Sequence, residues 1–85
     1  MKSDIGDLIK AIVLPLTDDK EQVSLTTDQQ EDYLIYNLHV SGRDAGRIIG
    51  KQGRVAQAIR TVVYSQNHDD TKKVKLNIIP ELNND

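Results

Sequence analysis

The chain has 85 residues, of which 38% are hydrophobic and 28% charged, a composition typical of one small globular domain. It contains no cysteine, which excludes disulfides, thiolate metal ligands and cysteine nucleophiles and is typical of a reducing compartment. No apolar run approaches the ~18 residues of a membrane span. We therefore expect a cytoplasmic protein that makes no contact with the membrane interior.

Apolar residues recur at helical spacing near the N-terminus: Ile5, Leu8, Ile9, Ile12 and Val13. They follow Ser3, a plausible helix cap, and the pattern stops at Pro15. This predicts a helix over residues 4–14.

Alternating hydrophobicity then indicates two strands. Val23 and Leu25 alternate with polar neighbours, and residues 33–40 alternate in the same way. The stretch between them, residues 27–32, has the composition of a turn. A strand pair is expected here.

Two helices are expected next. Ser41 and Asp44 resemble a capping box, which predicts a short helix starting near Arg43 and ending at Gly50. A longer helix begins after Gly53 and extends to about residue 66, since its apolar residues again follow helical spacing.

Val74, Leu76 and Ile78 alternate with polar residues and predict a last strand, closed by Pro80. The expected order is helix, strand, strand, helix, helix, strand, which is an α+β domain. We expect residues 1–81 to form this single domain and residues 82–85 to be a flexible C-terminal tail.

The net charge of −2 is unevenly distributed. Residues 1–42 hold three basic and eight acidic residues, whereas residues 43–60 hold five basic residues and a single acid, Asp44. The basic residues of that segment are Arg43, Arg47, Lys51, Arg54 and Arg60. Positive charge is therefore concentrated around the predicted junction between the two helices.

The junction reads Gly50-Lys51-Gln52-Gly53. Two glycines permit a tight turn and a close approach of the backbone to a ligand, and the amide groups that begin the next helix favour an anion. Lys51 adds a full positive charge, with Arg47 and Arg54 within reach of neighbouring phosphates. These features predict a site for a phosphate-bearing chain.

Apolar residues beside the loop offer a floor for unpaired bases; they are Ile48, Ile49, Val55 and Ile59. The chain has three tyrosines and neither Phe nor Trp, which disfavours a sheet that stacks bases on aromatic residues.

The segment 46–60, with the sequence GRIIGKQGRVAQAIR, resembles the core motif of KH domains. In these domains a glycine loop joins two helices and clamps about four nucleotides. The element order is similar to the prokaryotic, type II arrangement, a three-stranded sheet packed against helices, and the similarity covers nearly the whole chain. Within that class, the sequence resembles the small single-KH RNA-binding proteins of the bacterial KhpA family.

This resemblance implies a cytoplasmic, single-stranded RNA-binding protein that acts as an RNA chaperone or post-transcriptional regulator. It also implies a homodimer, a possible heterodimer with a larger KhpB-type KH protein, and a link to cell shape. The residues expected to contact RNA are Arg47, Ile48, Ile49, Gly50, Lys51, Gln52, Gly53, Arg54 and Val55. Asp at both Gly50 and Gly53 is expected to abolish RNA binding and leave the fold intact.

Two questions stay open on the sequence alone. The apolar arc of the long helix is wide, and it fits equally a helix fully covered by its own domain and a subunit interface of Val62, Val63 and Tyr64. The acidic first 42 residues also allow a protein-interaction module in which RNA contact is secondary.

We expect neither an enzyme nor a bound cofactor. His39 and His68 lie far apart in the sequence, and neither belongs to a pattern of several ligands or of a nucleophile with its base.

Overall fold

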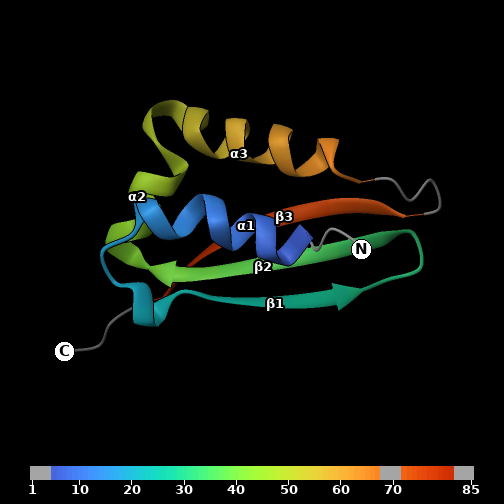
Figure 1. Cartoon of the computed structure of the whole chain (residues 1–85), viewed down its shortest axis with the longest axis horizontal. Coiled ribbons are helices and arrows are strands. Elements are labelled where there is room, and N and C mark those ends of the chain that lie inside the picture. The colour runs from blue at the N-terminus through green and yellow to red at the C-terminus, as the bar shows by residue number, and fades with distance from the viewer. Residues whose placement is uncertain (1–4, 68–71, 82–85) are drawn as a thin grey trace.

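The computed structural model describes residues 5–67 and 72–81, and this part of the chain contains three α-helices and three strands (Figure 1). The elements are α1 (Ile5–Val13), β1 (Ser24–Gln29), β2 (Tyr33–Ser41), α2 (Gly42–Ile49), α3 (Arg54–Ser65) and β3 (Lys73–Glu81). Short 3₁₀ turns cover Leu14–Leu16, Lys20–Gln22 and Lys51–Gly53. The predicted order is confirmed, while Ser3 and the predicted tail 82–85 lie outside the described residues.

The three strands form one sheet in the order β1-β2-β3. β1 and β2 pair antiparallel, and β2 and β3 pair parallel. Parallel neighbours need a crossover connection, and α2 and α3 provide it. Leu38, in the middle of the sheet, lies opposite Leu25 on one side and Ile78 on the other.

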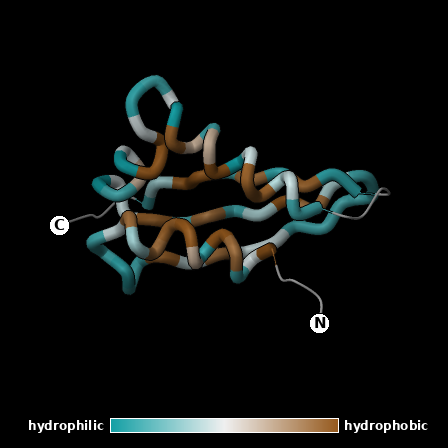
Figure 2. Tube along the Cα trace, turned by 45° about the horizontal axis from the view of Figure 1, so that its top comes forward, coloured by the Kyte–Doolittle hydropathy of each residue, from teal (hydrophilic) through white to brown (hydrophobic). Residues whose placement is uncertain are grey.

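All three helices pack against the same face of the sheet, and alternate residues of β2 and β3 point towards them. The core of buried residues joins Ile9 and Val13 of α1, Ile48 of α2, Ile59 and Val63 of α3, and Tyr36, Leu38, Val40, Val74 and Leu76 of the sheet. Figure 2 shows the hydrophobic segments of the helices and strands facing one another, and a hydrophilic loop projecting at the top.

The first strand is longer than the sequence predicts. Residues 27–29 were expected in a turn, but they pair with Tyr36, Ile35 and Leu34 of β2, and the connection shrinks to residues 30–32. The local turn composition is overridden by the pairing with β2, since strand formation depends more on neighbouring strands than on local propensity.

The last strand passes through Pro80, where we expected it to end, and reaches Glu81. The Leu76 N–H donates to the Tyr64 hydroxyl (3.1 Å) and the Leu76 carbonyl accepts from Arg60 Nε (3.1 Å), so this backbone faces away from β2. Pro80 is four residues further on and faces the same way. Its missing N–H therefore removes no hydrogen bond from the sheet.

Candidate functional site

The loop between α2 and α3 has a backbone that ordinary residues rarely adopt. Gly50 has φ 76° and ψ 177°, a combination that is nearly restricted to glycine. Gly53 (φ 75°, ψ 12°) and Gln52 (φ 59°, ψ 24°) are left-handed. The Gly50 N–H donates the last helical hydrogen bond of α2 to Gly46 O (2.9 Å), and the Gly53 N–H donates to Gly50 O (3.2 Å). The result is a tight, exposed turn.

Gly50 is also required for space. A Cβ at this position would lie 2.4 Å from Val55 Cγ2, whereas a Cβ at Gly53 would meet no atom within 4 Å. The expectation that Asp at Gly50 leaves the fold intact is therefore wrong. Lys51 and Gln52 are exposed and can be changed without this conflict.

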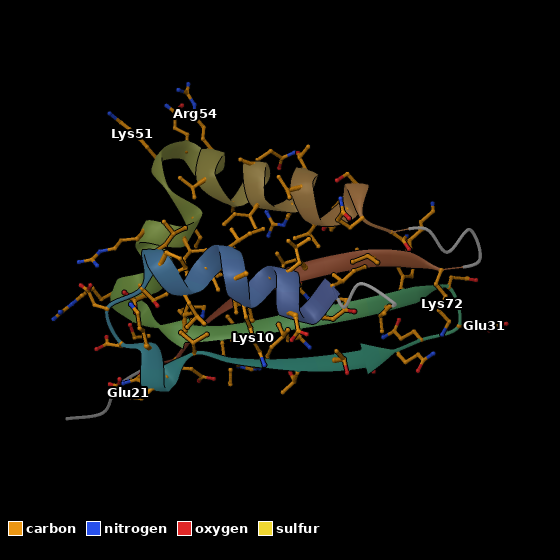
Figure 3. The ribbon with its side chains drawn as sticks, in the orientation of Figure 1. Lys10, Glu21, Glu31, Lys51, Arg54 and Lys72 are labelled. Atoms are coloured by element: carbon orange, nitrogen blue, oxygen red, sulfur yellow. The ribbon has the colours of Figure 1, made fainter. Side chains whose placement is uncertain are left out.

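Cationic side chains surround the loop. Lys51 and Arg54 are exposed and point away from the body of the domain (Figure 3). Arg47, one turn before the loop, is also exposed, and its Nη1 lies 2.5 Å from Oδ2 of Asp18. That hydrogen bond is the main reason why the pKa of Arg47 is raised.

The start of α3 has no side-chain cap. Gly53 occupies the N-cap position, where a Ser, Thr, Asp or Asn would satisfy a free amide of the first turn. The partial positive charge of the helix N-terminus is therefore open to an external anion beside Lys51 and Arg54.

The side chain of Asp44 holds the segment after α1 against α2. Its side chain is 0% exposed, and its carboxylate accepts the N–H groups of Asp18 (3.0 Å) and Asp19 (2.9 Å). The Asp18 hydrogen bond contributes most to a lowered Asp44 pKa; burial opposes it, and the Asp19 hydrogen bond adds to the lowering. The Asp44 N–H donates to Ser41 Oγ, which confirms the predicted cap of α2.

Asp18 and Asp44 have roles that no sequence pattern indicated. The Asp44 carboxylate was expected to complete a capping box; instead it holds a connector more than 20 residues earlier in the chain. No local pattern links these positions, because the contact depends on how α2 packs against the segment after α1.

The apolar residues predicted to contact RNA separate into two groups. Ile49 and Val55 are 39% and 37% exposed and lie on the surface beside the loop. Ile48 is 0% exposed and belongs to the core, as does Ile59. Ile48 thus supports the loop from inside and offers no surface to a ligand, which corrects its place among the contact residues.

The predicted dimer residues also separate. Val62 is 47% exposed, and Tyr64 is exposed with its hydroxyl holding the edge of β3. Val63 is fully buried in the core. Val63 therefore stabilises the domain, and an interface on α3 would have to use Val62.

Within residues 5–67 and 72–81, no group of three or more side chains is arranged to hold a metal ion. His39 lies on the uncovered face of the sheet, where its ring contacts Glu81 (2.7 Å) and Thr26 (3.2 Å). His68 is outside the described residues. No helix in the described part of the chain is long and apolar enough to span a membrane.

A three-stranded sheet with a parallel β2–β3 pair, crossed by two helices that meet at a Gly-Lys-Gln-Gly loop, defines a type II KH domain. Residues 6–78 match the KhpA/KhpB KH-domain family. The chain belongs to this family.

Curated relatives agree with this assignment. The chain is 49% identical over 73 residues to the RNA-binding protein KhpA of Listeria monocytogenes EGD-e, covering 86% of this chain and 96% of that protein. It is 45% identical over 76 residues to the KhpA protein of Lactiplantibacillus plantarum (89% of each chain). Identity to the Bacillus subtilis protein is 39% over 74 residues, covering 87% and 91%. No solved structure matches the chain significantly.

Proposed function

We propose that this protein binds single-stranded RNA and holds its phosphates at the Gly50–Gly53 loop. The observation that carries the proposal is the loop itself: a glycine-dependent turn, an uncapped helix N-terminus and the exposed cations Lys51 and Arg54 lie together. Relatives that align over most of the chain are named RNA-binding proteins. A binding role without catalysis fits both.

The phosphate contacts divide between backbone and side chains. With no Cβ at Gly50 or Gly53, an RNA strand can approach the loop amides closely. Lys51 and Arg54 then supply charge-assisted hydrogen bonds, and Arg47 can join them if it leaves Asp18. Gln52 adds a neutral donor and acceptor at the tip.

The apolar contacts come from both sides of the loop. Ile49 at the end of α2 and Val55 at the start of α3 are exposed and available to unpaired bases. Bases in a duplex are stacked and paired, so this small apolar surface favours a single strand.

The wider role proposed is that of a cytoplasmic RNA chaperone or post-transcriptional regulator with a link to cell shape. It forms a homodimer, or a heterodimer with a KhpB-type protein. The exposed Val62 supports an interface on α3, and the shared KhpA/KhpB family supports the partner. Two copies would present two loops to one RNA and so raise its affinity.

The test is a fluorescence-anisotropy titration of short single-stranded RNAs with wild type and a Lys51→Asp/Gln52→Asp variant. Two carboxylates in place of these exposed side chains repel phosphates without the steric conflict at Gly50. We expect the variant to lose at least roughly tenfold in affinity, and wild-type binding to weaken as salt rises.

The matched control is Lys10→Asp/Ser24→Asp, which makes the same charge change at exposed positions on α1 and at the start of β1. It should bind nearly as wild type. If both variants lose RNA affinity equally, the loss comes from the overall charge of the protein and not from contacts at the loop. If wild type binds no RNA at either of two salt concentrations, the domain is instead a protein-interaction module.

A further inference from the structure

A pocket of about 380 Å³ lies away from the loop, at the other end of α3. It is lined mainly by apolar atoms of Tyr33, Tyr64, Asn67, Lys73, Val74 and Lys75. Its members come from the starts of β2 and β3 and the end of α3. Figure 3 places Lys72, next to this pocket in sequence, at the end of the molecule opposite Lys51 and Arg54.

The walls of the pocket are fixed by contacts among the described residues. The Tyr64 hydroxyl accepts the Leu76 N–H, which holds the Tyr64 ring against the edge of β3. Lys75 Nζ lies 5.2 Å from the centre of the Tyr33 ring, a cation–π contact. Val74 forms a buried floor. Two tyrosines therefore line one preformed hollow, and the Lys75 ammonium lies over the ring of one of them.

An exposed stripe of α3 connects the loop with this pocket. Arg54, Gln57, Thr61 and Tyr64 follow one another at intervals of three or four residues, so they share one face of the helix, and all four are exposed. Arg54 and Tyr64 are ten residues apart, which is about 15 Å at the α-helical rise. The apolar Val55 and Val62, seven residues apart, form a separate stripe.

We propose that the pocket receives an unpaired base of the same RNA strand that the loop holds, with Lys73 and Lys75 at the flanking phosphates. This inference rests on the proposed function. Aromatic rings accept the face of any base, and lysines match the charge of the backbone. At ~3.4 Å per stacked nucleotide, about four nucleotides cover the distance along α3, so the footprint extends to eight or so.

The test compares a four-nucleotide and a ten-nucleotide single-stranded RNA, and a ten-nucleotide RNA whose distal bases are removed but whose phosphates remain. Wild type should bind the intact ten-mer roughly tenfold more tightly than the four-mer. Much of that gain should disappear with the abasic strand, because a base rather than a phosphate fills the pocket.

The variants are Lys73→Gln/Lys75→Gln and Tyr33→Leu, with Lys10→Gln as a control on an exposed face of α1. The pocket variants should keep wild-type affinity for the four-mer and lose the gain from length, and the control should keep both. If both pocket variants still bind the ten-mer more tightly than the four-mer by the wild-type factor, the gain comes only from the larger number of binding registers on a longer strand. That result overturns the inference.

The two proposals fail differently. If four-mer binding depends on Lys51 and Gln52 but no length-dependent gain is lost in the pocket variants, the pocket is not an RNA site and the loop remains one. If wild type binds neither RNA, the RNA function itself fails. If an aromatic peptide binds at the pocket and RNA does not displace it, the pocket belongs to a protein partner instead.

Discussion

The two glycines of the loop are needed for different physical reasons. Gly50 combines a backbone conformation nearly restricted to glycine with a neighbour, Val55, that occupies the place of a side chain. Gly53 is left-handed but has open space around it. The first glycine therefore determines how α3 starts against the loop, and the second only permits the turn.

We expect Gly50→Ala to lower the free energy of unfolding by about 3 kcal/mol, from backbone strain together with overpacking against Val55. Gly53→Ala should cost about 1 kcal/mol, the penalty of a left-handed residue. Gly46, inside α2 with no atom near its missing Cβ, is the control: Gly46→Ala should stabilise by about 1 kcal/mol. Urea unfolding measures all three, and equal losses at the two loop positions would contradict this account.

At the scale of elements, the contact between α2 and the segment after α1 depends on the buried Asp44 carboxylate. In Asp44→Asn, one oxygen becomes an amide that faces a backbone N–H donor, so we expect the melting temperature at neutral pH to fall by roughly 5–10 °C. Circular dichroism melts check this value.

The same contact predicts a pH dependence. The Asp44 pKa in the fold lies below its ordinary value of 3.8, so as pH falls the unfolded chain binds this proton first. The contribution is complete well above 3.8 and is lost as pH drops through the lowered pKa. The gap in melting temperature between wild type and Asp44→Asn should therefore narrow from pH 7 towards pH 3. A constant gap would exclude ionisation of Asp44 as its cause.

The sequence was sufficient for the type and order of the elements, because their periodicities are clear and their caps local. As expected, α2 has Ser41 as its N-cap and Gly50 as its C-cap. The length of β1 was misjudged, since residues 27–29 acquire strand structure only by pairing with β2. The path of β3 through Pro80 likewise depends on which edge of the strand faces outward.

For the candidate site, the sequence was sufficient to predict the loop and its cations, but not which of the neighbouring apolar side chains are buried. Helical spacing shows that Ile48 and Ile49 point in different directions, yet it does not say which of them meets the core. The same applies to Val62 and Val63 on α3. The pocket at Tyr33 and Tyr64 had no sequence signal, since it forms where β2 and β3 begin and α3 ends.

At the scale of the whole molecule, α3 presents two different exposed stripes. The stripe with Arg54 and Tyr64 is largely polar, and the stripe with Val55 and Val62 is apolar. A second protein subunit on Val62 would therefore leave Val55 and the polar stripe of the same helix open to an RNA strand.

Val62→Asp should convert the proposed homodimer to a monomer, raising the dissociation constant roughly a hundredfold, because association would bury an unpaired carboxylate. The fold should persist, since Val62 is 47% exposed in the single chain. Sedimentation velocity over a range of concentrations gives the answer. Gln57→Asp, on the polar stripe of the same helix, should leave assembly unchanged. A wild type that sediments as a monomer at high concentration would reject the dimer.

If Arg47 is one of the RNA contacts, as proposed, its ion pair with Asp18 makes RNA binding partly an exchange reaction. Arg47 already has an internal anion, so a phosphate that takes it must displace a carboxylate that stays attached to the protein. The released carboxylate then recruits a cation from the solvent. The slope of log affinity against log salt should accordingly be shallower, by about one ion, than the number of cations around the loop implies. The acidic connector would thus make this small domain less sensitive to the salt concentration around it.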